Sequence, residues 1–308
     1  MECVDCGSAT TSERRGRTPS AGFPAAHAAG TFASSAQGYR RFRCRDCGRE
    51  FNERSGGLLN RTQYPSDVIA LVVLWRLRYR LTLQDLSEMF LQRGIVFSHE
   101  AVREWEAKLT PFLTNELRQR RRGRAGAGRR SWHVDETYLK VRGRWCYLYR
   151  AIGRNGDLVD TMLSGHRDMA AAKAFFRSAK SATGLVPDRV TTDGHGSYPR
   201  AIRSALGRHV EHRTSAYKNN RLEQDHRGVK GRIRCMRGFK EVGAAERFCR
   251  GHDELRAFLR CRHRHNQHVP ANRRRRVAWT RSSDALAPAP FGVRRCGQRS
   301  GVPAPACG

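Results

Sequence analysis

Acidic residues are scarce in this sequence. Its 308 residues include 28 Asp and Glu against 59 Lys and Arg, which gives a formal charge of +31 at pH 7. The excess positive charges repel one another in the isolated protein. When a Lys or Arg side chain contacts a phosphate of a nucleic acid, by contrast, a condensed counterion is released, which favours binding. We therefore expect a nucleic acid as the partner, with an anionic membrane as the lesser alternative.

Long hydrophobic runs are also missing. The longest one, Val68 to Trp75, is too short to cross a bilayer and is followed directly by Arg76. The first residues, MECVDCG, do not resemble a signal peptide. We expect a cytoplasmic chain without membrane attachment, in which the ten cysteines are reduced thiols or metal ligands.

Four cysteines near the start form two Cys-x-x-Cys pairs. The pairs are Cys3 with Cys6 and Cys44 with Cys47. This spacing lets four thiolates surround one tetrahedral Zn²⁺, and Gly48 permits a tight turn after the second pair. Residues 1–52 are predicted to be a zinc-ribbon-like module with a flexible, Gly/Ala/Ser-rich insert at 8–40. The alternative is four unrelated reduced thiols.

Residues 64–116 have the pattern of paired helices. Thr82 with Asp85 resembles a capping box, Gly94 can end that helix, and Ser98 can cap the next one. Two short helices joined by a glycine-containing turn are typical of a helix-turn-helix DNA-binding domain. A plain helical packing unit is the alternative.

The second of these helices and the segment after it supply candidate DNA contacts. His99 and Arg103 would face a DNA groove from the second helix. A basic linker is predicted at 117–130, and its candidate phosphate ligands are Arg120, Arg121 and Arg122. The basic tail at 263–308 lacks periodicity and is rich in Arg, Pro and Gly, so we expect it to be disordered.

Residues 131–262 alternate between strand and helix patterns. Three short β-rich segments are separated by breaks at Gly143 and at Asn155-Gly156, and helix and strand patterns then alternate. The predicted order is β-β-β-α-β-α-β-α. This is the order of an α/β domain with an RNase H-like mixed sheet of five strands.

Three acids fall at matching points of that topology. Asp135 lies within the first strand, Asp193 ends the fourth, and Glu223 begins the last helix. The first strand of such a sheet is central and the fourth lies beside it, so the two aspartates should approach each other. Glu136 should face the opposite side of its strand. Taken singly, an Asp at a strand end is more often a turn or capping residue.

The helix that carries Glu223 has a cationic flank. At about 100° per residue, Leu222 and Val229 share an apolar stripe, and Glu223, Arg227 and Lys230 lie together beside it. Three carboxylates can hold two Mg²⁺ ions, or Mn²⁺ in their place. One ion would activate a water or 3′-hydroxyl and the other would stabilise the leaving oxygen. Arg227 and Lys230 would position the DNA backbone.

The motifs that carry these residues resemble one family closely. "SWHVDETYLKVRGRWCYLYRAIGRNGDLVDTMLS", "VTTDGHGSYPRAI" and "NNRLEQDHRGVKGR" are similar to the DDE transposases of the insertion-sequence-six family, and the similarity extends from about 40 to 262. The resemblance implies a catalytic triad of Asp135, Asp193 and Glu223 with divalent metal ions, and Lys230 matches a basic position of such enzymes.

This resemblance also implies a function. Members cut double-stranded DNA at terminal inverted repeats and join the 3′-hydroxyl ends to target DNA, so we expect a homo-oligomer at the nucleoid of a prokaryotic cell. One alternative is a non-enzymatic zinc and helix-turn-helix regulator, or an inactive transposase remnant. A structure-specific nuclease that cuts without joining is another.

Overall fold

The computed structural model describes residues 2–13, 39–122, 130–215, 220–236 and 238–260, with a few positions between 270 and 281. Most of the predicted insert at 8–40, the middle of the linker at 117–130 and nearly all of the tail at 263–308 lie outside these ranges. The chain divides into two units between Leu71 and Val72, and each unit is described separately. None of the helices in the described ranges has the length and hydropathy of a membrane-spanning segment.

The first unit contains a small antiparallel sheet around the cysteine pairs. Its strands, in the order β1-β2-β3, are β1 (Thr11–Glu13), β2 (Arg41–Cys44) and β3 (Glu50–Asn52). The rings of Phe42 and Phe51 stack at 5.7 Å between centroids, and Phe51 packs against Cys3 and Cys44. A core this small buries little apolar surface and therefore contributes little to stability.

Helices begin near the end of the first unit and continue into the second. They are α1 (Ser66–Arg78), α2 (Leu83–Leu91) and α3 (His99–Arg121). The predicted capping box is confirmed, because Thr82 accepts a hydrogen bond from the Asp85 N–H and the Asp85 side chain accepts one from Thr82. Ser98 accepts from the Ala101 N–H at 3.2 Å, and Gly94 takes φ 72° after α2, as expected.

The third helix is longer than the sequence pattern suggested. It passes through Pro111 and ends at Arg121, five residues beyond the predicted domain end at 116. Its buried positions continue as Leu113, Leu117 and Arg121, at the four-residue spacing of one helix face. The segment predicted as a linker therefore begins inside a packed helix.

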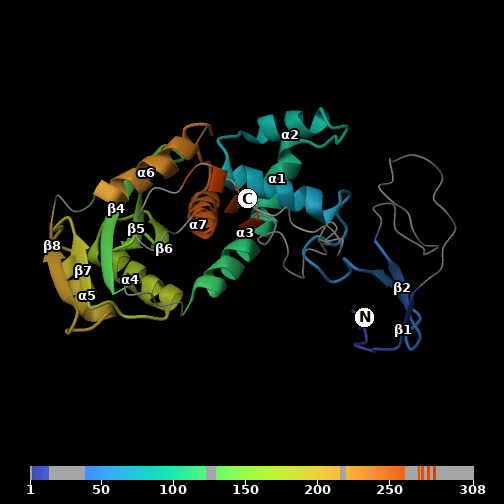
Figure 1. The fold of residues 1–308 in the computed structure, drawn as a ribbon, viewed down its shortest axis with the longest axis horizontal. Coiled ribbons are helices and arrows are strands. Elements are labelled where there is room, and N and C mark those ends of the chain that lie inside the picture. Colours follow the sequence, from blue (N-terminus) through green and yellow to red (C-terminus); the bar gives the residue numbers. More distant parts are fainter. Residues whose placement is uncertain are drawn as a thin grey trace, which may run out of the picture. The chain divides into compact units, whose positions relative to one another are not determined.

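The domain that begins at Ser131 has the predicted strand order. Its strands are β4 (Ser131–Val141), β5 (Arg144–Gly153), β6 (Leu158–Ser164), β7 (Arg189–Thr192) and β8 (Glu211–Thr214). They form one sheet in the order β6-β5-β4-β7-β8 (Figure 1). The first three strands pair antiparallel, and β7 pairs parallel with both β4 and β8. This mixed sheet with β4 at its centre confirms the RNase H-like prediction.

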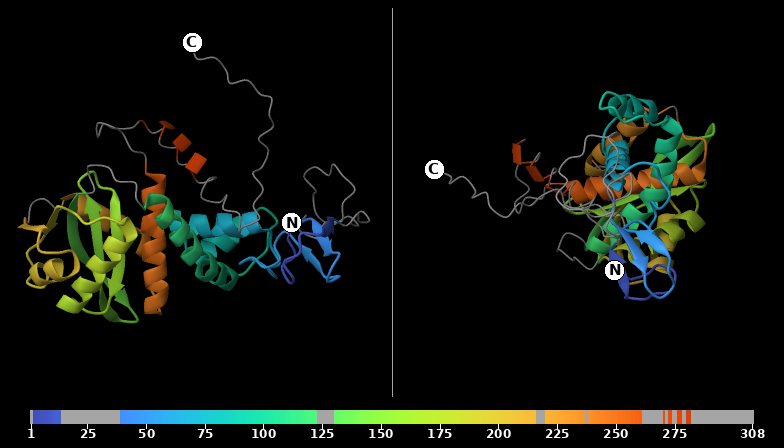
Figure 2. Two further views of the ribbon diagram at one scale, coloured as in Figure 1. Left: turned by 90° about the horizontal axis from the view of Figure 1, so that it is seen from below. Right: turned by 90° about the vertical axis from the view of Figure 1, so that its right-hand side faces the viewer.

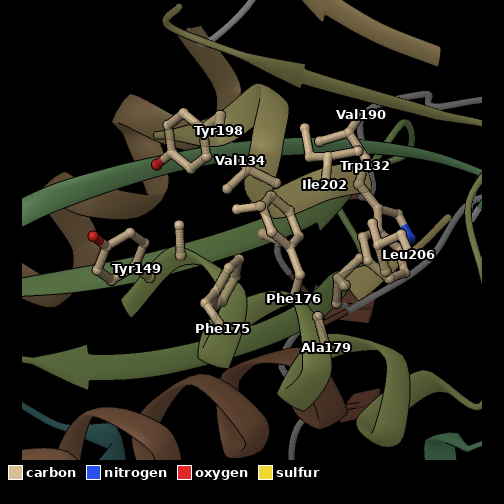
Figure 3. Close-up of a cluster of buried hydrophobic side chains, with 14 of the residues drawn as sticks. Trp132, Val134, Tyr149, Phe175, Phe176, Ala179, Val190, Tyr198, Ile202 and Leu206 are labelled. Atoms are coloured by element: carbon tan, nitrogen blue, oxygen red, sulfur yellow. The ribbon is translucent and has the colours of Figure 1, made fainter. Parts of the chain in front are cut away.

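Four helices cover this sheet. They are α4 (Met169–Thr183), α5 (Tyr198–Ala205), α6 (Asn220–Ile233) and α7 (Val242–Leu259). α4 and α5 cover one face, where Trp132, Val134, Phe175, Phe176 and Ile202 are among the fully buried side chains (Figure 3). Each such large side chain contributes about 1.5–3 kcal/mol through its burial. This core therefore lies beneath the part of β4 that pairs with β7.

The other face carries α6 and α7, and the sequence pattern had not separated α7 as an element. Figures 1 and 2 show α7 beside α3 next to the sheet. Asp253 of α7 accepts two hydrogen bonds from Arg150 of β5, at 2.8 and 2.9 Å, and a third from Thr161 at 2.6 Å. Burial alone would raise the pKa of Asp253, but Arg150 and His252 outweigh it and lower the pKa.

A second buried ion pair joins α3 to α7. Arg121 donates to Glu254 at 2.6 Å through Nε, and its Nη1 reaches the Val159 carbonyl at 2.9 Å. The side chains of Arg121 and Glu254 are 10% and 2% exposed. Arg118 of α3 also donates to the buried Asp160 at 2.9 Å. The helical region and the sheet are thus joined by ion pairs whose carboxylates, on Asp160 and Glu254, are almost completely buried.

Replacing Glu254 with Ala should lower the free energy of unfolding by about 3–5 kcal/mol, because the Arg121 guanidinium would stay buried without its carboxylate. Urea denaturation followed by circular dichroism measures this loss. Glu116→Ala is the matched control on α3, since Glu116 is 33% exposed and pairs with Arg120 at 3.5 Å. The control should change stability by at most about 1 kcal/mol, and equal losses in the two variants would contradict the buried-pair argument.

Candidate active site

Asp135 and Asp193 meet at the centre of the sheet. The parallel pairing of β4 with β7 aligns His133 with Thr191, so both strands deliver their next residues to the same edge. Gly194 takes φ 95°, which lets the chain turn away immediately after Asp193. Carboxylate oxygens of Asp135, Glu136 and Asp193 all lie within 4.8 Å of one another. The two aspartates approach each other as the strand order predicted.

Glu136 faces the α4 and α5 side of β4, opposite to Asp135 as expected, but its carboxylate still belongs to this cluster. Its carboxylate accepts hydrogen bonds from the Arg167 guanidinium and the Tyr198 hydroxyl. The pairing of β4 with β7 ends at His133, so within the described residues no strand pairs with this edge of β4 beside Glu136. A glutamate side chain is long enough to reach around an uncovered edge. The alternation rule predicts the direction of Cβ, and it does not predict the position of the carboxylate.

Arg167 holds two of the acids at once. Besides its contact with Glu136, it donates from Nη2 to Asp193 at 3.0 Å. The other Asp193 oxygen accepts the His195 N–H at 3.0 Å. The side chain of Arg167 is 26% exposed, against 3% for Glu136. A guanidinium thus supplies the positive charge between two carboxylates, and the sequence pattern gave no signal for it.

The crowding of negative charge perturbs Asp135. Burial raises the pKa of Asp135 to about 7, and the nearby carboxylates of Glu136 and Asp193 add to the rise. The Glu136 N–H donates to Asp135 at 2.9 Å and offsets part of this effect. Burial and the Glu136 carboxylate raise the pKa of the Tyr198 phenol as well. Convergent, partly desolvated carboxylates of this kind favour a bound cation.

Glu223 lies outside this cluster. Leu222 and Val229 of α6 are buried, and Glu223, Arg227 and Lys230 are exposed, as the helical pattern predicted. Among the described residues, the group of acids that lies within 4.8 Å does not include Glu223. The structure therefore brings together two of the three predicted acids.

His226 is the α6 residue that approaches Asp135. Its Nδ1 lies 3.9 Å from Oδ2 of Asp135, and its side chain is 9% exposed. Burial lowers the pKa of His226 to about 3, with Arg150 and Lys230 contributing, so the ring is neutral near pH 7. Sequence reasoning missed this residue, although His226 lies between Leu222 and Val229 on the same apolar stripe.

The oxygen donors of this cluster suit a hard divalent cation. Mg²⁺ and Mn²⁺ prefer carboxylate oxygens and are commonly held by one or two of them. Asp135 provides such an oxygen from within β4, and Asp193 provides one directly after β7. The donor set therefore fits the predicted metal.

The predicted DNA-contacting residues of α3 differ in exposure. His99 and Arg103 are more than half exposed at the start of the helix, each near Glu100. Arg122 is exposed at the other end. The prediction that Arg121 contacts DNA is wrong. Arg121 is buried and bound to Glu254, because its position continues the inward face of α3. It is not available to a phosphate.

The four predicted zinc ligands form a compact cluster in the first unit. Their sulfur atoms all lie within 4.8 Å, with Cys3 and Cys47 at 3.6 Å and Cys6 and Cys44 at 3.6 Å. All four are free thiols. The two pairs have matching turns, since Gly7 donates to the Cys3 carbonyl at 2.9 Å and Gly48 to the Cys44 carbonyl at 3.1 Å. Hydrogen bonds from the backbone of Cys6 and Asp5 lower the pKa of Cys3 to about 7.

Known proteins resemble this chain in the same region. A family model described as a DDE domain matches residues 129–262. The transposase for insertion sequence-like element IS431mec of Staphylococcus aureus is 35% identical over 174 residues, which cover 55% of this chain and 75% of that protein. The transposase for insertion sequence element IS257 in transposon Tn4003, also from Staphylococcus aureus, has the same identity and coverage.

Among solved structures, the catalytic core domain of BIV integrase aligns with 50% of this chain and 98% of its own. The sequence identity is 14% and the TM-score is 0.33. The strand order β6-β5-β4-β7-β8, rather than this likeness, establishes the fold.

Asp135→Asn should stabilise the metal-free protein at pH 8. The folded-state pKa of Asp135, about 7, lies above the ordinary aspartate value of 3.8, so the folded state keeps a proton that the unfolded state has lost. The stability of the unchanged protein therefore declines as the pH rises from about 4 to 7, and that of the variant lacks this decline. At pH 8 we expect the free energy of unfolding of the variant to exceed that of the unchanged protein by about 1–3 kcal/mol. This difference should become smaller toward pH 5.

Thermal unfolding at several pH values in the presence of a chelator measures this gap. The exposed Asp188, which precedes β7, provides the control Asp188→Asn. A gap for Asp135→Asn that does not change with pH would disprove the charge argument.

Proposed function

The chain belongs to the IS6 family of DDE transposases, and we propose that Asp135, Asp193 and Glu223 are its catalytic triad. A member of this family is an insertion-sequence transposase, a polynucleotidyl transferase that acts on DNA. The observation that carries the triad is the convergence of Asp135 and Asp193 within 4.8 Å, inside the segment that matches the DDE domain. Glu223 completes the triad from α6, the helix that packs on β4.

Asp135 and Asp193 hold Mg²⁺ or Mn²⁺ in this proposal, with Glu223 as the third ligand. When bound, the metal ions activate the attacking water or 3′-hydroxyl and stabilise the leaving oxygen at phosphorus. Arg227 and Lys230 lie exposed on the same helix as Glu223. They neutralise phosphates and fix the path of the strand past the carboxylates.

DNA ends are recognised elsewhere in the second unit. His99 and Arg103, exposed at the start of α3, contact base edges of the terminal inverted repeat. Arg122 contacts phosphate, as does Arg120 when it leaves Glu116. Joining of two element ends calls for at least two copies of the active site, so the working form is a homo-oligomer.

One observation favours a second candidate function. Glu223 is exposed and lies outside the acid cluster, which is also expected of a DNA-binding regulator descended from a transposase. Such a protein would bind the element ends and make no product. A strand-transfer assay distinguishes the two functions.

Asp135→Asn should abolish cleavage and joining of inverted-repeat DNA with Mg²⁺ or Mn²⁺, by at least about 1,000-fold, because it removes a charged metal ligand. DNA binding should persist. The assay uses the full chain with the DNA that flanks its own gene and resolves products on a denaturing gel. Asp188→Asn, at an exposed position five residues before Asp193, should retain activity.

Glu223→Gln tests the third ligand in the same assay and should lose activity to a similar extent. Full joining by Asp135→Asn refutes the triad as a whole. Full joining by Glu223→Gln alone removes Glu223 from it.

We also propose that the cluster of Cys3, Cys6, Cys44 and Cys47 binds one structural Zn²⁺. Purified protein should contain about one zinc per chain, and Cys44→Ser should lose most of it because three thiolates bind more weakly than four. Cys146→Ser is the control, since that buried thiol of β5 lies outside the cluster. Metal content is measured by mass spectrometry, and the same zinc content in both variants would rule out the site.

A further inference from the structure

The β4–β5 hairpin exposes aromatic side chains close to the acid cluster. Tyr138 and Trp145 are 52% and 60% exposed, among the most exposed large apolar side chains in the described ranges. Their ring centroids lie 6.2 Å apart, and the ring of Tyr147 lies 5.4 Å from that of Tyr138. We call these three residues the hairpin platform. Exposed apolar groups gathered at one place commonly mark a binding surface.

The platform is exposed because burial along β4 changes side. Trp132 and Val134 are buried under α4 and α5, but further along the strand the buried positions are Thr137, Leu139 and Val141. From Tyr138 onward, the even-numbered side chains Tyr138 and Lys140 are therefore exposed. The cross-strand contact of Tyr138 with Tyr147 supports the hairpin by about 0.2–1 kcal/mol, which does not call for exposed rings.

This surface begins next to the catalytic acids. Tyr138 lies two residues beyond Glu136, so both side chains project from the same face of β4. Glu136 belongs to the cluster with Asp135 and Asp193. A DNA strand whose phosphate lies at the cluster would have a neighbouring nucleotide over the platform.

Cations flank the rings. Nζ of Lys140 lies 5.5 Å from the centroid of the Trp145 ring. A cavity of about 770 Å³ is lined by the platform together with Lys140 and with Lys230 and Arg234 of α6. Its volume is within the range of nucleotide-sized ligand sites. Planar apolar surfaces bordered by positive charge are the features that bind single-stranded nucleic acid, through base stacking and phosphate contacts.

We propose that the hairpin platform binds an unpaired nucleotide beside the scissile phosphate. Its base stacks on Tyr138 and Trp145, and Lys140 and Lys230 hold the adjoining phosphates. A paired base in duplex DNA has its faces covered by its neighbours, so the occupant is a single-stranded overhang or a frayed end. The inference rests on the proposed function, because it takes the acid cluster as the position of the cut.

The test uses the full chain and two DNA probes that carry its own terminal repeat. One is a blunt duplex, and the other has a short single-stranded overhang at the cut site with 2-aminopurine in it, whose fluorescence falls when the base stacks. The double variant Tyr138→Leu/Trp145→Leu should bind the overhang probe about 10- to 100-fold more weakly and lose the fluorescence quenching. Its affinity for the blunt duplex should change less than about threefold.

Tyr138→Phe/Trp145→Phe is the matched variant. It keeps aromatic faces in place and should retain quenching and most of the affinity for the overhang probe. Thermal unfolding of both double variants checks that the hairpin still folds. Loss of affinity for both probes alike would overturn the proposal, as would undiminished quenching in the leucine variant. A change of oligomeric state with unchanged DNA binding would assign the platform to a second copy of the chain and overturn it too.

The test of the hairpin platform can fail independently of the test of the proposed function. If the unchanged protein joins strands but binds overhang and blunt DNA with equal affinity and without quenching, the platform alone is refuted. If it makes no product while the leucine variant selectively loses the overhang probe, the platform is supported and the catalytic assignment fails.

Discussion

The structure depends on the parallel pairing of β4 with β7, which brings negative charges together. Asp135 and Asp193 follow strand residues that are locked in register by His133 and Thr191, and a shift in that register would separate them. The pKa of about 7 at Asp135 records the electrostatic cost of this arrangement. Trp132, Val134 and Val190, all fully buried beneath the same strands, provide the opposing stabilisation. The acids converge because the buried core holds β4 and β7 in this register.

A second set of constraints comes from paired charges away from the acids. Arg150 and Asp253 join α7 to β5, and Arg121 and Glu254 join α7 to α3. Buried pairs add little net stability compared with apolar residues of the same size, but they fix geometry, because any other packing would leave a charge unpaired. α3 carries the predicted DNA-contacting residues at its exposed start. DNA bound there would thus be held by a helix whose far end is anchored to the catalytic sheet.

Local patterns in the sequence predicted much of this fold. Alternating apolar residues and glycine breaks gave the order of β4, β5 and β6, and cap chemistry at Thr82 and Ser98 gave the starts of two helices. Two outcomes were not predicted, and their causes differ. Arg121 was counted as a surface cation, but the four-residue spacing of α3 buries it. Alternation placed Glu136 on the correct face of β4 but gave no sign that its carboxylate reaches the other two acids.

The position of the third acid follows from a different kind of information. Strand order fixes Asp135 and Asp193, whereas Glu223 is placed by how α6 is turned about its own axis. Leu222, His226 and Val229 are buried and fix the rotation of α6 about its axis. Glu223 is therefore exposed, beside Arg227 and Lys230. A helical pattern specifies which residues share a face, and the tertiary contacts decide which face meets the acids. This explains why two members of the predicted triad are together and one is not.

The distribution of charge explains why such a site needs a cation. The chain as a whole is strongly positive, and Arg227, Lys230 and Lys140 lie on the helix and hairpin next to the acids, so a phosphate is attracted to this face from every side. At its centre the phosphate meets Asp135, Glu136 and Asp193, which repel it at short range. Arg167 balances part of that charge through Glu136 and Asp193. In the proposed function, a divalent cation on Asp135 and Asp193 would turn the same carboxylates from a barrier into a binding site, and this would make the attraction of DNA to this face compatible with the acid cluster.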